Sequence, residues 1–240
     1  MIQLNKKGFT IIELMLAMTA VSLLMLSIAT LTIFMKDIMV KGNTYRELNA
    51  ASRNINNSLS RAFNSISLSG WDGQMRAAAT AGPVYYVKTG QAGAFCTGSF
   101  SYLWNDDLVL KISTAVAPIR YSGAATTDKS IRFIKVVDSS MQYCDPATRN
   151  TAWVTVPRDS SVNEVLSSGE TNMMLYDVNF SQIATDNDTG QSLINISYIL
   201  GTGSDAAQQI TATGGTCTPN SDENYCAINN FNVTVRTIGR

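Results

Sequence analysis

Histidine is absent from the 240-residue sequence, and proline is absent from its first 82 residues. Without histidine, the chain lacks the commonest general base and the commonest metal ligand. Without proline, nothing interrupts a helix in the N-terminal third by that route. Net charge is also absent, because 18 basic residues balance 18 acidic ones. A nucleic-acid-binding protein would need a clustered basic face, so we expect no nucleic-acid partner.

Catalytic motifs are missing as well. The sequence contains no Gly-x-Ser-x-Gly, no phosphate-binding loop and no dinucleotide fingerprint. Two adjacent carboxylates, Asp106 and Asp107, lie in a polar stretch that predicts a solvated turn rather than an acid–base pair. We therefore expect no enzymatic activity and no cofactor.

A long apolar segment occupies residues 9–35, and Glu13 is its only charged residue. At 1.5 Å per residue, a helix of this length spans the hydrocarbon core of a bilayer. Lys6 and Lys7 precede it, so the positive-inside rule places the N-terminus in the cytoplasm and the rest of the chain outside. The segment is too long for a secretory signal peptide and has no small-x-small cleavage site.

Glu13 does not suit a plain membrane anchor. An acidic side chain inside a membrane helix costs about 2.5–3.5 kcal/mol on insertion scales, and such a residue usually has a specific partner. A simple anchor gains nothing in return for this cost. The position of Glu13 therefore requires a further explanation.

The stretch "KKGFTIIELM" resembles the class III signal of type IV prepilins and pseudopilins. The shared pattern is a short basic leader, a glycine, a phenylalanine and a glutamate four residues after that phenylalanine. The resemblance covers residues 1–40 closely. A fainter likeness, in "SLSRAFNSISLSGWDG", is to the large PilW-like minor pilins.

This resemblance implies roles for individual residues. A membrane-embedded prepilin peptidase would cut between Gly8 and Phe9, remove the leader 1–8 and methylate the new amino group of Phe9. Glu13 would then pair with the Phe9 amine of a neighbouring subunit and set the axial register of assembly, because opposite charges lower the cost of burying each other. The implied partners are other pilin subunits, contacted through the N-terminal helix, the peptidase and an inner-membrane assembly platform.

The helix is predicted to continue to residue 69, with Gly70 just beyond its end. An apolar stripe, interrupted by the polar Ser52, supports this continuation and predicts packing against the protein's own sheet. Its members are Tyr45, Leu48, Ile55, Leu59, Phe63 and Ile66. The expected organisation is thus a leader (1–8), a long helix (9–69) with a transmembrane part (9–35), and a β-rich head (70–240). The fold class is α+β and pilin-like.

Alternating apolar residues predict antiparallel strands in the head. The clearest runs place Met174, Tyr176, Val178 and Phe180 on one face, Ile194, Ile196, Tyr198 and Leu200 on another, and Phe231, Val233 and Val235 on a third. Further candidate strands are "VYYVK" from Val84, "LVLKIST" from Leu108, "IRFIKVV" from Ile131 and "AWVTV" from Ala152.

All four cysteines follow the apolar segment, and no Cys-x-x-Cys pair occurs. An even number of cysteines on the outer side of a membrane predicts two disulfides in an oxidising compartment. Four cysteines allow three pairings; the short loop favours Cys217–Cys226, which leaves Cys96–Cys144. Buried free thiols are the alternative.

The segment "DNDTG" offers the one candidate for metal binding. Asp186 and Asp188 resemble part of a calcium loop, but a full loop needs more oxygen ligands and a distal glutamate. The segment lies between two alternating runs, where a hairpin turn rich in Asp, Asn and Gly is expected. The turn is the favoured interpretation, so no metal site is predicted.

These patterns predict a filament subunit that is inserted once in the inner membrane, with its head in the periplasm, before it reaches a pilus at the cell surface. The large head and the absence of proline from the membrane half favour a minor pilin that primes assembly or lies near the tip. The alternatives are a minor pseudopilin of a type II secretion system and an adhesive or DNA-uptake pilin. A membrane-tethered enzyme is disfavoured by the missing catalytic groups.

Overall fold

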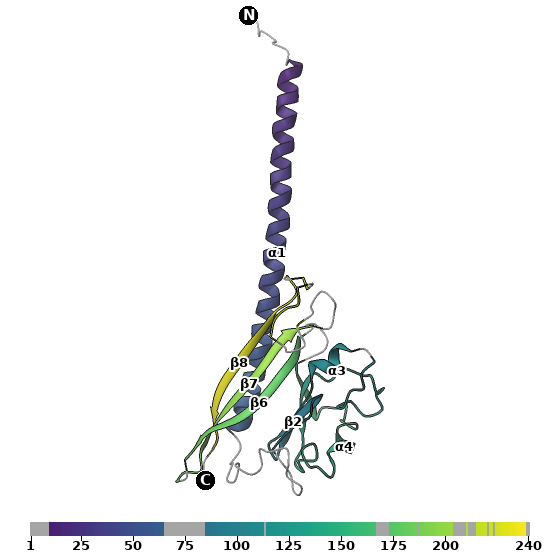
Figure 1. Ribbon diagram of the computed structural model, residues 1–240, viewed down its shortest axis with the longest axis vertical. Coiled ribbons are helices and arrows are strands. Elements are labelled where there is room, and N and C mark those ends of the chain that lie inside the picture. Colours follow the sequence, from purple (N-terminus) through teal and green to yellow (C-terminus); the bar gives the residue numbers. More distant parts are fainter. Residues whose placement is uncertain are drawn as a thin grey trace, which may run out of the picture. The chain divides into compact units, whose positions relative to one another are not determined.

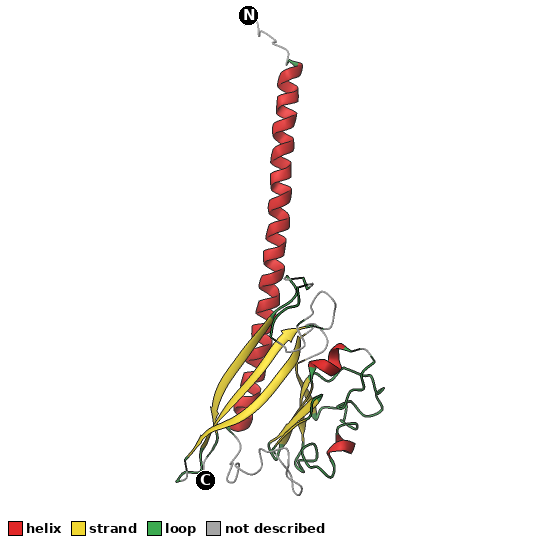
Figure 2. Ribbon diagram, in the orientation of Figure 1, coloured by secondary structure: helices red, strands yellow, loops and turns green. Residues whose placement is uncertain are grey.

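A computed structural model describes residues 10–64, 85–112, 114–166, 173–186, 188–203, 210, 215–219, 221–222 and 224–238 of the chain. The chain divides into two units, Met1–Asn43 and Thr44–Arg240, each of which is described by itself. Figure 1 labels their helices and strands, and Figure 2 colours them by type. Together they form the predicted α+β arrangement of a long N-terminal helix followed by antiparallel sheets.

Helix α1 runs without interruption over Ile11–Phe63. Its first part, in the N-terminal unit, is long and apolar enough to cross a membrane. Asn64 forms a turn directly after the helix. The rest of the predicted extension, residues 65–69, and Gly70 lie outside the described residues.

The second part of α1 contributes one face to the core of the head. Leu48, Ile55, Leu59 and Phe63 are buried, as the apolar stripe predicts. Tyr45 is exposed, so the prediction was wrong at this position: the buried face begins only at Leu48. Ile66 lies outside the described residues.

Ser52 interrupts the apolar stripe because it meets a polar partner. It is buried, and its hydroxyl lies 2.9 Å from the Tyr198 hydroxyl, which also donates toward the Ser52 carbonyl oxygen at 3.1 Å. The Tyr198 hydroxyl lies 2.6 Å from Asn56 Oδ1 as well. Burial raises the pKa of Tyr198 to about 12. These bonds satisfy polar groups that would otherwise be costly in an apolar core.

A three-stranded antiparallel sheet, in the order β6-β7-β8, packs against this part of α1 (Figure 1). Its strands are β6 (Met173–Thr185), β7 (Ser192–Thr202) and β8 (Ile228–Arg236). The predicted inward face of β7 is confirmed, because Ile194, Ile196, Tyr198 and Leu200 are all buried in the core beside α1. The predicted face of β8 is also confirmed, with Val235 buried there and Phe231 and Val233 packed against it.

Strand β6 does not keep one apolar face. Its pairing with β7 shifts between Leu175 and Asp177, which leaves Tyr176 as an extra residue. Such a bulge reverses which side chains face inward. Val178 therefore joins the core beside α1, whereas Met174 and Tyr176 pack in a separate cluster on the other side. The prediction was therefore wrong for Met174 and Tyr176, whereas Val178 and Phe180 share the face beside α1 as predicted.

A second, five-stranded antiparallel sheet follows the order β1-β2-β3-β4-β5. Its strands are β1 (Tyr86–Lys88), β2 (Ala92–Cys96), β3 (Phe100–Asn105), β4 (Phe133–Val137) and β5 (Val162–Leu166). β1 and β4 were predicted, and the other three were not. One face of the sheet contributes to the core beside α1, and the other covers a second core.

Two predicted strands in this region are not strands: one is replaced by a helix and the other by a turn. Helix α3 (Asp107–Lys111) replaces the strand expected from Leu108, and helix α4 (Arg149–Ala152) ends where the strand from Ala152 was expected to begin. A short apolar run fits either structure, and the acidic start and basic end of α3 favour a helix. After α4, the Trp153 indole donates to the Tyr143 carbonyl oxygen at 2.9 Å, a tertiary contact that holds this segment as a turn.

Aromatic rings join α1 to both sheets. The Phe63 ring stacks on Phe95 of β2 at 4.6 Å and lies 5.8 Å from Phe180 of β6, between ring centroids. The Trp104 ring of β3 covers Gly93, its cross-strand partner, so closely that a Cβ there would lie 2.1 Å from the indole. Residue 93 must therefore be glycine.

Candidate functional site

The start of α1 is held by Thr10 and Glu13. The Thr10 carbonyl oxygen accepts from the Leu14 amide at 3.2 Å, which makes Thr10 the N-cap residue of the helix. The Glu13 amide donates to the Thr10 hydroxyl at 3.3 Å, and Glu13 Oε2 accepts from the Thr10 amide at 3.2 Å. This reciprocal pair is a capping box.

The capping box gives Glu13 a role inside its own chain. Both bonds from Thr10, including one from its hydroxyl at 3.1 Å, go to Oε2. Within the part of the chain that the structure describes, Oε1 makes no hydrogen bond. A carboxylate in the first turn also complements the positive end of the helix dipole. Glu13 can therefore cap the helix with one oxygen and still present the other to a second partner.

Sequence reasoning singled out Glu13 but missed Thr10. The signal was present, because Thr-x-x-Glu directly before an apolar run is the signature of a capping box. The other predicted residues at this end, Lys6, Lys7, Gly8 and Phe9, lie outside the described residues.

The apolar surface that follows Glu13 is exposed in the described part of its unit, residues 10–43. Ile11, at the helix start, is 79% exposed, and exposed apolar side chains continue around the helix as far as Met39. The large ones are Ile12, Leu14, Met15, Leu16, Met18, Val21, Leu23, Leu24, Met25, Leu26, Ile28, Leu31, Ile33, Phe34, Met35 and Ile38. A helix that is apolar all round is typical of a segment buried in a membrane or against other helices.

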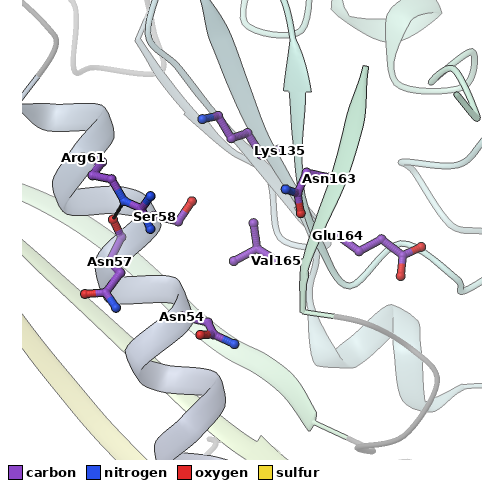
Figure 3. A pocket seen from close by; sticks show the side chains of 8 residues that line it. All are labelled: Asn54, Asn57, Ser58, Arg61, Lys135, Asn163, Glu164 and Val165. Atoms are coloured by element: carbon purple, nitrogen blue, oxygen red, sulfur yellow. Dashed lines mark hydrogen bonds between the residues drawn. The ribbon is translucent and has the colours of Figure 1, made fainter. Parts of the chain in front are cut away.

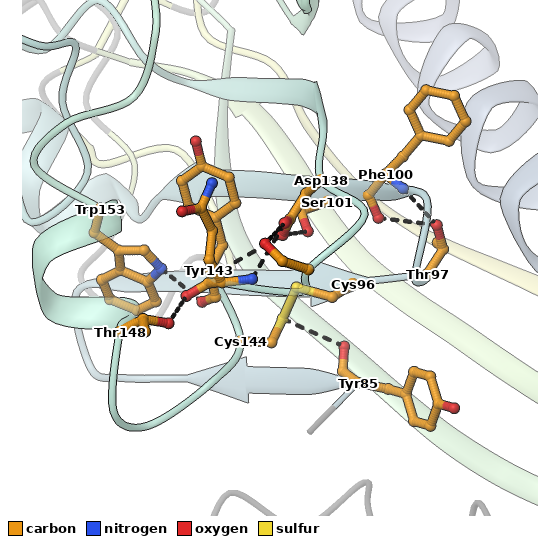
Figure 4. The surroundings of a disulfide bond; sticks show 12 residues. Tyr85, Cys96, Thr97, Phe100, Ser101, Asp138, Tyr143, Cys144, Thr148 and Trp153 are labelled. Atoms are coloured by element: carbon orange, nitrogen blue, oxygen red, sulfur yellow. Dashed lines mark hydrogen bonds between the residues drawn. A yellow bond between two sulfur atoms is a disulfide. The ribbon is translucent and has the colours of Figure 1, made fainter. Parts of the chain in front are cut away.

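The head contains the two disulfides Cys96–Cys144 and Cys217–Cys226, which are the pairs that the spacing favoured. The first joins the end of β2 to the loop after β4 (Figure 4). Beside it, buried Asp138 accepts from the Ser101 hydroxyl at 2.6 Å and from the Gln142 amide at 3.1 Å. The disulfide and this carboxylate therefore hold the same loop to the second core.

The second disulfide holds the segment before β8. Cys217 and Cys226 pack with Leu110, Met174 and Tyr176 in the small cluster that the β6 bulge creates. The same segment contacts the helix, because the Thr44 hydroxyl donates to the Asn224 carbonyl oxygen at 3.0 Å. This bond links the segment to the part of α1 that belongs to the head.

Asp106 and Asp107 do not form a solvated turn, so that prediction was wrong. Both are about 95% buried where β3 leads into α3. Burial raises the pKa of Asp106 to about 6, despite the opposing influence of Lys88. Burial also raises the pKa of Asp107, which lies 3.3 Å from the Lys111 ammonium. The polar residues of this stretch gave no indication in the sequence that Asp106 and Asp107 would be buried.

In the predicted turn between β6 and β7, the Asp186 carboxylate bonds to groups of the turn itself. Asp186 accepts from the Asp188 amide at 3.0 Å and from the Thr189 hydroxyl at 2.7 Å, and the latter bond is the main reason that the pKa of Asp186 is lowered. Gly190 closes the turn with a φ of 68°. Across the described ranges, no group of three or more His, Cys, Asp or Glu side chains could hold a metal ion.

Comparison with known proteins gives one match. Residues 3–29 match the family model of the prokaryotic N-terminal methylation motif. Searches of curated proteins and of solved structures found no match. The motif covers the basic leader, Thr10, Glu13 and most of the exposed apolar helix. The chain therefore carries a prokaryotic N-terminal methylation motif, the class III signal peptide of type IV pilins.

Proposed function

We propose that this protein is a minor pilin, a filament subunit that primes assembly of a type IV pilus or lies near its tip. The observation that carries the proposal is the N-terminal part of α1. It combines the methylation motif, a fully exposed apolar surface and one carboxylate at the helix start. Pilin-type subunits assemble through such a helix.

The proposed processing follows from the motif. The peptidase cuts between Gly8 and Phe9, and Phe9 is methylated. Lys6 and Lys7 hold the leader in the cytoplasm until the cut, and the head lies in the periplasm. The two disulfides of the head suit that oxidising compartment.

We further propose that Glu13 pairs with the Phe9 amine of a neighbouring subunit. Two opposite charges in an apolar filament core lower each other's burial cost, so the pair favours one axial register. The free Oε1 supports this role, because capping occupies only Oε2. An inner-membrane assembly platform would bring the two subunits together.

Capping and pairing can be separated by two substitutions. Glu13→Gln retains a side chain that completes a capping box but carries no charge, whereas Glu13→Ala removes both features. If pairing matters, both variants should insert in the membrane yet be absent from sheared filaments analysed by mass spectrometry. Normal incorporation of Glu13→Gln would show that capping alone is needed and would overturn the pairing.

The minor role has its own test. Mass spectrometry of sheared filaments should find a chain that starts at methylated Phe9, at a low ratio to another pilin. Equal or greater abundance would identify a major subunit. If deletion abolished protein secretion and left pili unchanged, the protein would instead be a minor pseudopilin.

A further inference from the structure

A polar pocket of about 330 Å³ lies in the head between α1 and the edge of the five-stranded sheet (Figure 3). Arg61, Asn57 and Asn54 line it from the helix, and Lys135 of β4 and Asn163 of β5 line it from the sheet. This volume is at the lower end of the roughly 300–1,000 Å³ typical of small-molecule sites. It suits a single ring better than a peptide segment.

The pocket is lined by two cations, Arg61 and Lys135. Burial lowers the pKa of Lys135, and the nearby charge of Arg61 lowers it further. Among the described residues, neither cation forms an ion pair. Glu164 also lines the pocket, but its carboxylate points away from the cations in Figure 3 and accepts from the Tyr121 hydroxyl at 3.3 Å. An anion in the pocket would find two unpaired cations.

Both cations are held in place before any ligand arrives. The Lys135 ammonium lies 3.8 Å from the centroid of the Phe100 ring, a cation–π contact that restricts the position of the ammonium. The Arg61 Nε donates to the Asn57 carbonyl oxygen at 3.0 Å, which leaves the two terminal nitrogens of the guanidinium for a carboxylate. Pre-arranged donors reduce the entropy lost on binding.

Three asparagines that line the pocket supply neutral donors and acceptors. Within the described part of the chain, the carboxamides of Asn54, Asn57 and Asn163 make no hydrogen bond. Each offers one acceptor and two donors, which matches the hydroxyl groups of a sugar. A bare ion would use the cations but would leave these three amides unused.

We propose that this pocket binds one carboxylated sugar residue of a glycan. Its carboxylate lies between Arg61 and Lys135, and its ring hydroxyls bond to Asn54, Asn57 and Asn163. The proposal concerns the head alone and does not depend on membership of a filament, so the two can fail separately.

The test is a ligand titration of the full chain in a polyoxyethylene detergent, which carries neither sugar nor phosphate. NMR signals of the backbone and side-chain amides are recorded at each ligand concentration. The probe is D-glucuronate, and its matched controls are glucose, which lacks the carboxylate, and cyclohexanecarboxylate, which lacks the hydroxyls. Glucuronate should shift the signals of the three asparagine side chains and bind at least tenfold more tightly than either control. Arg61→Gln and Lys135→Gln should each weaken it at least tenfold.

Arg53→Gln serves as the control variant, because Arg53 is exposed on the same helix and does not line the pocket. It should bind glucuronate as the unchanged chain does. Equal binding of cyclohexanecarboxylate, tighter binding of inorganic phosphate or of N-acetylglutamate amide, or no binding of glucuronate would each overturn the proposal. An unchanged backbone spectrum shows that a variant is folded.

Discussion

The two parts of α1 are one helix with two different environments. Residues 10–43 expose their large apolar side chains, as Phe34 does at 65%, whereas the large apolar side chains from Leu48 to Phe63 are buried, Phe63 completely. At the start of the first part, the side chains of Thr10 and Glu13 bond to each other, whereas the second part contacts both sheets. The difference teaches that the second part is packed by its own chain, whereas the exposed apolar surface of the first part suits lipid or another helix.

The strongest test of this comparison replaces one phenylalanine in each part. Phe63→Ala should destabilise the head by about 3–5 kcal/mol, because it removes a buried ring that stacks on Phe95. Phe34→Ala should leave the free energy of unfolding of the head unchanged within about 0.5 kcal/mol. Urea unfolding of the full chain in detergent, followed by tryptophan fluorescence, measures both. A comparable loss in Phe34→Ala would break the comparison.

The disulfides should stabilise only the head. Replacing Cys96 and Cys144 by alanine removes a crosslink across a sequence separation of 48 and should cost about 4 kcal/mol in the chain-entropy model. The shorter Cys217–Cys226 loop, with a separation of 9, should cost about 3 kcal/mol. Hydrogen exchange of amides in residues 11–43 should stay the same in both variants. Faster exchange there would show that the first part also depends on the head.

A third test uses the buried carboxylate of the head. The pKa of Asp106 is about 6 in the folded chain, above its ordinary value, so the folded state binds the proton more tightly than the unfolded state. The contribution of Asp106 to stability should therefore be greatest below pH 4, fall by about 3 kcal/mol as pH rises through 6, and then level off.

Asp106→Asn should remove most of this fall, leaving a smaller slope from Asp107, whose pKa is raised as well. Asp186→Asn is the matched control, because Asp186 is exposed in a turn. It should retain the fall. Urea unfolding at pH 4 and pH 7 measures the effect, and equal stability of the unchanged chain at both values would contradict it.

The smallest effect is expected at the helix start. Thr10→Val removes the cap hydroxyl and should destabilise the first turn by about 1 kcal/mol, with no effect on the head. Thr10→Ser retains the cap and serves as the control. The Glu13 amide donates to the Thr10 hydroxyl, so its rate of hydrogen exchange should rise several-fold in Thr10→Val and stay the same in Thr10→Ser. If the two variants exchange alike, the hydroxyl does not hold the helix.

Residues with one covered face were the easiest to predict. Strands β7 and β8 alternate because one side meets the core and the other meets solvent, and the second part of α1 shows its stripe for the same reason. The methylation motif was equally easy to predict from the sequence, because it is defined by particular residues at a particular spacing.

Residues covered on both faces were not predictable in this way. All five residues of β2 are buried, as are five of the six in β3, so neither strand shows a period of two. The β6 bulge could not be predicted either, because the extra residue at Tyr176 depends on the register in which β6 pairs with β7. The pocket at Arg61 and Lys135 likewise required a helix and a strand that are far apart in the sequence.

The bonds of Tyr198 have a mechanical consequence. The hydroxyl of this one residue on β7 lies within hydrogen-bond distance of Ser52 and Asn56, which are on adjacent turns of α1. A displacement of α1 along the sheet would have to break these contacts together, because they meet at one hydroxyl. Tyr198 thus acts as a single anchor point that fixes the second part of α1 against β7.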